Sequence, residues 1–498
     1  MVLKNVHVWG QGVTDLAIAN GKFAQVGGDI AGDETWTGKW ILPGFIDAHC
    51  HILPTGLDLQ KLHLGDCQSP EDVLDKVAAR DRELGDGDWL MAVHYDQTKF
   101  PGAEHLTRHQ LDAVTTRPTI LRHVNGHASV ANSTALIHAG ITNETKDPDG
   151  GTFVRDASGE LTGVLLERAH EEVTSSAPSP TLEQMVDAIM AASQEMAKFG
   201  ITNATDMMTG RFDLDLELQA YRIASEKNCP IRLRMYLQWA PVLGSRRIDP
   251  ARLRELIAAM NPDKCEVLGL KVFADGAIGS ATAAIHGKFL TTGGNGQLIY
   301  REDRLAKIIA DIDAGGWRCA THTIGDRSTD LVMDAYEKSS DPRRHRIEHI
   351  MIMSDQQIER LAKLGTHATM QPEFLHAFGH AYRAQLGDDV AAKLKRVRSV
   401  LDAGIPLSFN SDRPIVLGNP WVGINAAVNR PSGFDPAEAV TLKEAVDLYT
   451  QGGAKANFEE HRTGSIEVGQ FADFQVYDDE PLPGSSPSAV FMGGVRTV

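Results

Sequence analysis

The chain is poor in cysteine and has no long hydrophobic run. Its five cysteines are odd in number and scattered over 498 residues without a CxxC pair. This pattern disfavours both a disulfide framework and a cysteine-based structural zinc site. No apolar run approaches the roughly 18 residues of a membrane helix, and the N-terminal residues lack the pattern of a signal peptide. We therefore expect a soluble, cytoplasmic protein.

Basic residues are also in deficit, because 49 lysines and arginines stand against 66 acidic residues, for a net charge of −17. A surface this acidic repels nucleic acid and anionic membranes, so we expect neither as a partner. The length and the apolar content of 42% suffice for a large core. A chain of this size forms more than one domain, or one large barrel with additions.

Both ends of the chain are rich in β-strand and turn signals. Asn20-Gly21 lies between two apolar runs and predicts a hairpin with a type I′ turn. Residues 464–477 and 489–496 have similar character. Each segment is too short to fold alone. We therefore predict that residues 1–42 and 457–498 pack together as a small β-sandwich domain.

Residues 43–456 alternate between strand and helix patterns. The predicted helices at 181–199, 304–314, 355–364 and 391–403 are each followed by glycine. Strand-helix units with right-handed crossovers close most economically as a (β/α)8 barrel of the TIM type, an α/β fold. The eight predicted strand segments are 41–51, 200–206, 231–237, 268–275, 318–322, 346–349, 367–371 and 406–412.

An insertion at about 57–179 separates the first two barrel strands. It contains a predicted strand at 118–124 and a predicted helix at 128–139. In such barrels the βα loops form the C-terminal mouth, where function is built. We therefore expect the insertion to lie over the mouth.

Polar side chains close four of the predicted barrel strands. His49 and His51 are two residues apart on a strand, so both can face the barrel interior. That pair alone could arise by chance, but His322, His349 and Asp412 end three further strands. The strand ends converge on one mouth, and imidazole and carboxylate groups are ligands of divalent metals. The set therefore predicts a metal site.

Lys271 lies inside an apolar strand, where an ammonium group is costly to bury. One interpretation is an ion pair with Asp275 or another carboxylate, or a side chain that extends to the rim. The other is a neutral amine that takes up carbon dioxide, because the carbamate formed is an anionic arm able to bridge two cations. The neighbouring histidines and aspartate favour the carbamate.

Short motifs run in order over nearly the whole chain: 43–51, 126–128, 162–167, 271–280, 322–327, 346–349, 371–372, 411–412, 442–445 and 464–473. With them the chain resembles the amidohydrolase superfamily, in its YtcJ-like branch (amidohydrolase family 3), which includes N-substituted formamide deformylase. Two positions depart from the family. His94-Tyr95-Asp96 stands where Gly-Trp-Asp is frequent, and Ala281 stands where many members have arginine. Both regions are expected to shape the substrate pocket.

The resemblance implies two divalent metal ions. The implied ligands of the first are His49, His51 and Asp412, those of the second are His322 and His349, and a carboxylated Lys271 bridges the two ions. Zinc suits these ligands, as do iron, manganese and cobalt. The family also implies a homodimer.

The resemblance further implies two catalytic residues. Asp412 would take the proton of the attacking water. His127 would reach the substrate and help to hold the oxyanion. His127 could equally cap the helix predicted at 128–139.

The predicted function is a metal-dependent hydrolase that uses a metal-activated hydroxide on a small organic molecule. The bond is an amide or related C–N bond other than a peptide bond, in an N-acyl, N-formyl or cyclic amide. One alternative is a binuclear esterase or lactonase on the same ligands. A second is a mononuclear aminohydrolase (deaminase) of an amino-heterocycle, against which Lys271 and the lack of a glutamate soon after His322 argue. A third is a non-catalytic metal-binding or regulatory protein.

Overall fold

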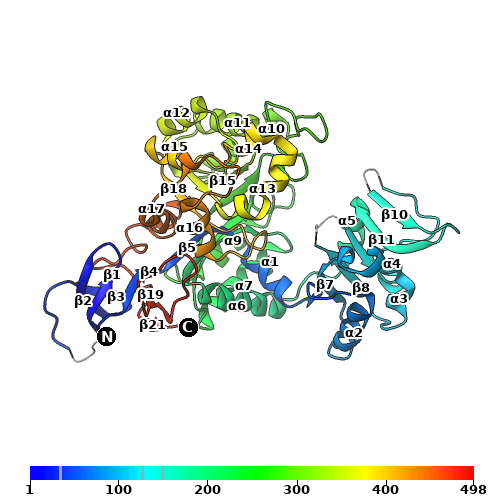
Figure 1. The fold of residues 1–498 in the computed structure, drawn as a ribbon, viewed down its shortest axis with the longest axis horizontal. Helices are drawn as coiled ribbons and strands as arrows, with labels where there is room; N and C mark the ends of the chain where they lie inside the picture. Colours follow the sequence, from blue (N-terminus) through cyan, green and yellow to red (C-terminus); the bar gives the residue numbers. More distant parts are fainter. Residues whose placement is uncertain (33–35, 125–127, 149–150) are drawn as a thin grey trace. The chain divides into compact units, whose positions relative to one another are not determined.

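The computed structural model of the protein describes residues 1–32, 36–124, 128–148 and 151–498. These residues form two compact units (Figure 1). One unit combines Met1–Gly56 with Met185–Val498, and the other is Leu57–Gln184. His127, the predicted substrate contact, lies outside the described residues.

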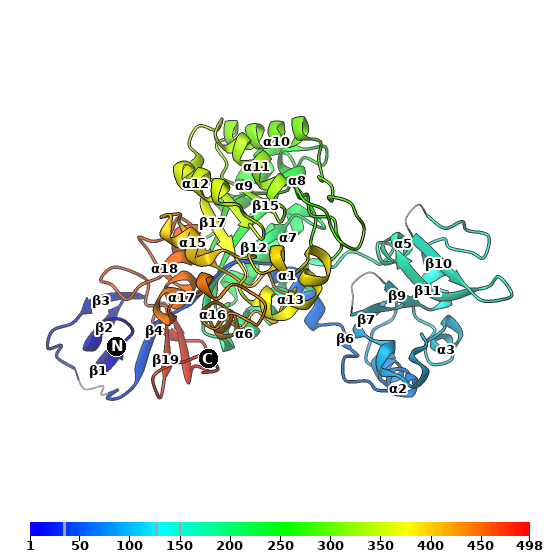
Figure 2. The ribbon, with the colours of Figure 1, turned by 45° about the horizontal axis from the view of Figure 1, so that its top comes forward.

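The larger unit contains a sheet of eight strands in the order β18-β17-β16-β15-β14-β13-β12-β5. Neighbouring strands pair in parallel, as in a TIM-type barrel (Figure 2). Each predicted strand segment overlaps one of these strands. Their bounds are β5 (Phe45–Cys50), β12 (Ile201–Thr209), β13 (Arg232–Gln238), β14 (Cys265–Phe273), β15 (Cys319–Thr323), β16 (Arg346–His349), β17 (His367–Met370) and β18 (Leu407–Phe409).

The two edge strands of this sheet, β5 and β18, meet just beyond their C-terminal ends. The amide of Asp412 donates to the carbonyl of His49 at 2.8 Å, and the amide of His51 donates to the carbonyl of Arg413 at 2.8 Å. These bonds bring the first and last strands together at the mouth. The predicted barrel is thereby confirmed, and the chain segments that carry His49, His51 and Asp412 are joined directly.

Helices follow the barrel strands at the predicted places. α12 begins with a capping box at Ser354 and ends at Gly365, whose φ of 66° is left-handed. The helices of the larger unit are α1 (Ile52–Leu59), α6 (Leu182–Lys198), α7 (Leu214–Glu226), α8 (Trp239–Leu243), α9 (Pro250–Ala258), α10 (Glu302–Ala314), α11 (Asp326–Tyr336), α13 (Glu373–Leu386), α14 (Asp388–Ala391), α15 (Val397–Asp402), α16 (Pro420–Val428), α17 (Leu442–Tyr449) and α18 (Gln451–Ala456), with α12 at Asp355–Leu364. Two 3-10 turns, η3 (Pro342–Arg344) and η4 (Pro436–Glu438), complete it.

The helix predicted at 391–403 is wrong in its middle, because α14 ends at Ala391 and α15 begins at Val397. Lys395 lies between them with a φ of 54°, a left-handed conformation that no α-helix contains. Its side-chain nitrogen is fully buried and donates to the carbonyl of His349 at 2.9 Å. A tertiary contact therefore breaks a segment whose local pattern is helical.

Both chain termini contribute to one mixed sheet of seven strands, in the order β21-β20-β19-β4-β1-β2-β3. Phe474 stacks on Phe491 at 4.6 Å between ring centroids and also contacts Phe23 at 6.0 Å, so residues of both termini share one hydrophobic core. The predicted hairpin at Asn20-Gly21 is confirmed, with φ of 53° and 75°. The strands are β1 (Val2–Val8), β2 (Gly12–Ala19), β3 (Lys22–Val26), β4 (Trp40–Pro43), β19 (Phe474–Tyr477), β20 (Ala489–Met492) and β21 (Val495–Arg496).

The segment predicted as one strand at 41–51 is two strands. β4 belongs to the terminal sheet and β5 belongs to the barrel, and Gly44 separates them. A Cβ atom at Gly44 would lie 2.0 Å from the hydroxyl of Thr202, so the crossing tolerates only glycine. The terminal sheet is thus joined to the strand that carries His49.

The insertion forms a six-stranded sheet in the order β10-β11-β9-β8-β7-β6. The helix predicted at 128–139 is wrong in its first part, because Ala128–Ala131 is a strand paired with β8 and β11. The side chain of Asn132 accepts from the amide of Ala135 at 3.0 Å and starts the helix there. The elements are β6 (Leu62–His63), α2 (Pro70–Asp81), β7 (Leu90–Tyr95), η1 (Gln97–Lys99), η2 (Pro101–Ala103), α3 (Arg108–Asp112), β8 (Thr119–His123), β9 (Ala128–Ala131), α4 (Ser133–His138), β10 (Gly151–Arg155), β11 (Leu161–Glu167) and α5 (Arg168–Thr174).

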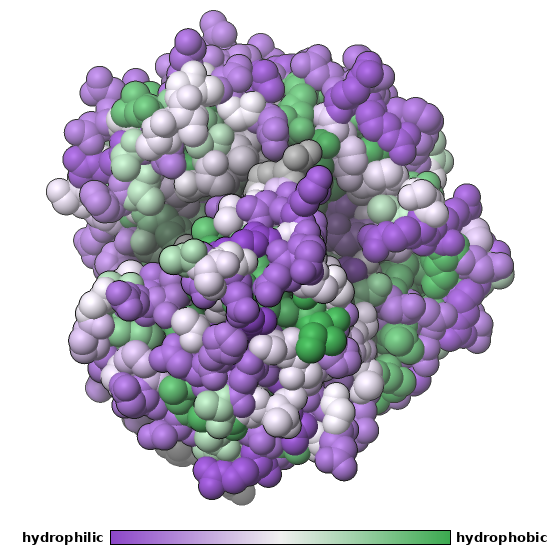
Figure 3. All heavy atoms as spheres, turned by 90° about the vertical axis from the view of Figure 1, so that its right-hand side faces the viewer, coloured by the Kyte–Doolittle hydropathy of each residue, from purple (hydrophilic) through white to green (hydrophobic). Residues whose placement is uncertain are grey.

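The outer surface is a mixture of polar and apolar side chains. On the face drawn in Figure 3, hydrophilic residues predominate and hydrophobic residues form small separate groups. Among the helices that the structure describes, none is long and apolar enough to cross a membrane.

Candidate metal centre

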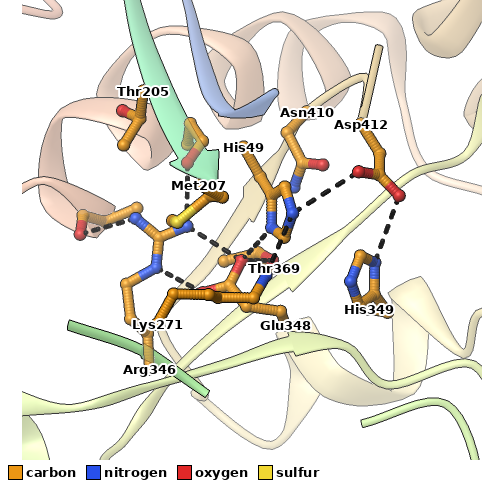
Figure 4. Close-up of polar contacts among 12 residues, drawn as sticks. His49, Thr205, Met207, Lys271, Arg346, Glu348, His349, Thr369, Asn410 and Asp412 are labelled. Carbon is orange, nitrogen blue, oxygen red and sulfur yellow. Dashed lines mark hydrogen bonds and ion pairs between the residues drawn. The ribbon is translucent and has the colours of Figure 1, made fainter. Parts of the chain in front are cut away.

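His49 is the penultimate residue of β5 and is almost completely buried, with 1% of its surface exposed. Its Nδ1 lies 2.6 Å from Oε2 of Glu348 (Figure 4). Burial raises the pKa of Glu348, but the charge of Arg346 and the hydrogen bond from His49 outweigh burial and hold this pKa well below its ordinary value. The carboxylate is therefore ionised and accepts the Nδ1 proton, which leaves the lone pair of His49 on Nε2.

Glu348 is an orienting residue that the sequence interpretation did not single out. Arg346 donates two hydrogen bonds to Glu348, from Nε to Oε1 at 2.6 Å and from Nη2 to Oε2 at 3.0 Å. Thr369 also donates to Oε2, at 2.7 Å. All of these side chains are fully buried. The only signal in the sequence is the alternation of Arg346 and Glu348 on one short strand, which places both on the same face.

Asp412 follows β18 and links the histidines of β5. Its Oδ1 lies 2.9 Å from Nε2 of His51 and 3.5 Å from Nε2 of His49. Burial raises the pKa of Asp412, but the hydrogen bond from His51 and the neighbouring basic side chains outweigh burial, so the net shift is downward. Asp412 also has a φ of 57°, which is rare outside glycine and concentrates at functional sites.

Lys271 lies on β14 with its Nζ 3.2 Å from Nε2 of His49 and no exposed surface. No carboxylate of the described residues lies within 4.0 Å of this nitrogen. Asp275 instead accepts hydrogen bonds from the amides of Ala284, Ile324 and Gly325. The predicted alternatives of an ion pair or an extension to the rim are therefore wrong. Burial lowers the pKa of Lys271 to about 8, so a neutral amine is accessible near neutral pH.

His349 and His322 approach the centre from the adjacent strands β16 and β15. Nδ1 of His349 contacts Oε1 of Gln371 at 3.1 Å and lies 3.9 Å from Oδ2 of Asp412. The rings of His322 and His349 are 4.4 Å apart between centroids, whereas Nε2 of His322 is turned to the carbonyl of Gly276 at 3.0 Å. Direct contacts thus connect all six predicted ligands: His49, His51, Lys271, His322, His349 and Asp412.

The chemistry of this set suits a divalent cation. His49, His349 and Asp412 are buried, and each offers a ligand atom within 4.8 Å of the others. Burial lowers the pKa of His49 to about 3 and that of His349 well below its ordinary value, so both imidazoles are neutral. The described residues also leave Nδ1 of His51 without a hydrogen-bond partner. Converging lone pairs and a buried carboxylate favour a compensating positive charge, which a metal ion would supply.

The fold and these residues define the class of the protein. The Amidohydrolase family matches residues 37–488, and the chain belongs to this family. The chain is 29% identical over 458 residues to the YtcJ protein of Bacillus subtilis (strain 168), covering 89% of this chain and 85% of that protein. It is also 29% identical over 470 residues to the N-substituted formamide deformylase of Arthrobacter pascens, covering 90% of this chain and 84% of that enzyme.

A solved structure is similar over almost its full length. It is an uncharacterized metal-dependent hydrolase from Pyrococcus furiosus, with a TM-score of 0.80 and 26% identity. The match covers 97% of this chain and 99% of that structure. Together with the relatives in sequence, it confirms the predicted barrel fold and the resemblance to the YtcJ-like branch.

Proposed function

We propose that the protein hydrolyses an amide or a related non-peptide C–N bond in a small organic molecule, such as an N-acyl, N-formyl or cyclic amide. The observation that carries the proposal is the convergence of His49, His349 and Asp412 at one point of the barrel mouth. The similarity to a formamide deformylase supports the choice of bond.

The centre would hold two divalent cations, with zinc as the first candidate. His49, His51 and Asp412 would hold one cation, and His322 and His349 would hold the other. Lys271, as a carbamate, would contact both, which agrees with its burial and its distance of 3.2 Å from Nε2 of His49. Cations bound in this way acidify a water molecule and polarise a carbonyl group.

Asp412 is the residue that would move the proton. Its Oδ1 is engaged by His51, whereas its Oδ2 accepts no hydrogen bond from the described residues. Oδ2 can therefore take a proton from the attacking water and return it to the leaving nitrogen. An amine must be protonated to leave, whereas an alkoxide needs this help less. A carboxylate in this position therefore meets the requirement of C–N cleavage for an acid, and the substrate screen below separates this activity from ester or lactone cleavage.

The first experiment is to measure metal content by plasma mass spectrometry, on protein purified without chelator in bicarbonate buffer. We expect near two metals per chain. A substrate screen should then show turnover of an N-formyl, N-acyl or cyclic amide in preference to matched esters, lactones and amino-heterocycles. One metal per chain together with release of ammonia from an amino-heterocycle would establish the deaminase alternative instead.

The role of Asp412 has its own test. Asp412→Asn should retain most of the metal and lose about 10²- to 10⁴-fold in kcat, the usual contribution of a positioned acid–base group. The control is Asp447→Asn, which removes a partly exposed carboxylate paired with Lys443 on α17. Full metal occupancy together with full activity in Asp412→Asn would disprove the role.

A further inference from the structure

Lys395 is a second buried lysine near the centre, and the proposed chemistry does not use it. Its Nζ donates to the carbonyl of His349 at 2.9 Å and to Oε1 of Gln371 at 2.7 Å. The side chain has no exposed surface, and no carboxylate of the described chain pairs with it. Burial of a lysine side chain costs free energy, and two neutral oxygen acceptors offset this cost only in part. We therefore look for a role of these contacts beyond packing.

The side chain of Arg430 stabilises the unusual backbone conformation at Lys395. Arg430 donates from Nη1 to the carbonyl of Lys395 at 3.0 Å and from Nη2 to the carbonyl of Leu394 at 2.8 Å. The left-handed φ of 54° is therefore stabilised by a neighbouring element and not by the local sequence. The result is a fixed amine beside Gln371.

Gln371 connects Lys395 to a predicted metal ligand. Its Oε1 lies 3.1 Å from Nδ1 of His349, and its Nε2 donates to Oδ1 of Asn410 at 2.6 Å. If the amide were reversed, its NH₂ group would face the N–H groups of Lys395. Lys395 therefore selects the orientation in which Oε1 faces both Lys395 and His349.

The orientation of this amide decides which nitrogen of His349 carries the proton. An oxygen opposite Nδ1 requires a hydrogen on Nδ1 and leaves the lone pair on Nε2. An NH₂ group in the same place would donate to Nδ1 and put the hydrogen on Nε2. Only the first tautomer offers Nε2 to a cation, because an imidazole nitrogen that carries a hydrogen cannot be a ligand.

We propose that Lys395 is a positioning residue of the metal centre, which acts through Gln371 to hold His349 in the tautomer that can bind a cation. The proposal rests on the metal centre of the proposed function. In this proposal, the break between α14 and α15 places the Lys395 amine beside Gln371.

Lys395→Met tests this relay, which runs from Lys395 through Gln371 to His349, because methionine fills a similar volume and has no hydrogen-bond donor. We expect the dissociation constant for Zn²⁺, measured by competition with a chromophoric chelator, to rise about 10- to 100-fold. The long-range ¹H–¹⁵N spectrum of ¹⁵N-histidine-labelled, metal-free protein should show His349 shifting toward the Nε2–H form, with His349→Gln used for assignment. The matched control is Arg396→Met, which removes the adjacent cation. Its guanidinium binds Asp355 and Glu438 instead, so the dissociation constant should not change.

A second substitution separates the relay from simple packing. In Gln371→Glu both oxygens are acceptors, so either orientation presents an acceptor to His349. Nδ2 of Asn410 has no partner among the described residues, so its amide can turn and donate to the new carboxylate. We expect Gln371→Glu to restore most of the affinity lost in Lys395→Met. A packing defect would not be repaired, because the space left by the lysine is the same.

The outcomes are distinguishable. An unchanged dissociation constant for Zn²⁺ together with an unchanged His349 tautomer in Lys395→Met would overturn the proposal. An equal loss of zinc affinity in Arg396→Met would also overturn it, as would a failure of Gln371→Glu to restore zinc affinity in Lys395→Met. A wild-type protein that binds no metal would instead overturn the proposed function. In that case the tautomer of the metal-free protein still decides the role of Lys395.

Discussion

The buried carboxylate of Glu348 accepts hydrogen bonds from both Arg346 and His49. Glu348→Gln removes its negative charge with almost no change in side-chain shape. The guanidinium of Arg346 then stays buried without a counterion, which costs about 3–5 kcal/mol when one member of a buried pair is removed. The new amide also faces donors on both sides, Arg346 and Nδ1 of His49. His49 loses its orienting acceptor, and metal affinity should fall about 10- to 100-fold.

Urea denaturation and a zinc competition titration measure the two effects separately. The control is Glu459→Gln, because Glu459 is also buried and receives two hydrogen bonds of 2.8 Å from Arg234. Glu459 contacts none of the predicted ligands, so its variant should lose comparable stability and keep its zinc affinity. Wild-type zinc affinity in Glu348→Gln, or an equal loss of affinity in both variants, would refute the reasoning.

Three further predictions concern the metal and the pH dependence of stability. Lys271→Met should lower the metal content, measured by mass spectrometry, from two toward one per chain. The control Lys264→Met, on the partly exposed turn before β14, should leave the metal content unchanged. Two metals retained in Lys271→Met would contradict a bridging role. Removing metal with a chelator should lower the melting temperature, and zinc at 100-fold its dissociation constant should restore about 2.7 kcal/mol; an unchanged melting temperature would argue against a metal centre. Burial lowers the pKa of His367 to about 3, so below its ordinary value of 6.5 only the unfolded chain takes up this proton. The contribution of His367 alone should therefore lower the free energy of unfolding by about 1.4 kcal/mol per pH unit below 6.5, or about 2 kcal/mol at pH 5; His367→Gln should lack this part of the loss in urea denaturation, and a pH dependence equal to that of the wild type would contradict the assignment.

The barrel strands were predictable because their signals are local. Each combines a short apolar run with a polar residue where the run ends, and neighbouring runs are separated by helical patterns that end at glycine. The break at Lys395 was not predictable, because its partners His349 and Gln371 are 46 and 24 residues away. The strand at Ala128–Ala131 was missed for the same reason, since pairing with β8 and β11 outweighs its helical composition.

The predicted ligands lie together because the ends of parallel barrel strands converge on one mouth. The residues that orient them were harder to find. Glu348 and Gln371 lie in the short motifs at 346–349 and 371–372, but those motifs do not say which side chain each residue orients. Such residues act through hydrogen-bond direction, and a spacing pattern contains no information about direction.

The bonds that join β5 to the segment after β18 also determine when the centre can exist. His51 and Asp412 are in contact although 361 residues separate them in sequence. At about 5–20 residues per second, a ribosome needs roughly 20–70 s to make the chain between them. During that time the first histidines have been synthesised but their carboxylate partner has not. A metal ion would therefore enter this site late in biosynthesis, after the segment that carries Asp412 has been made.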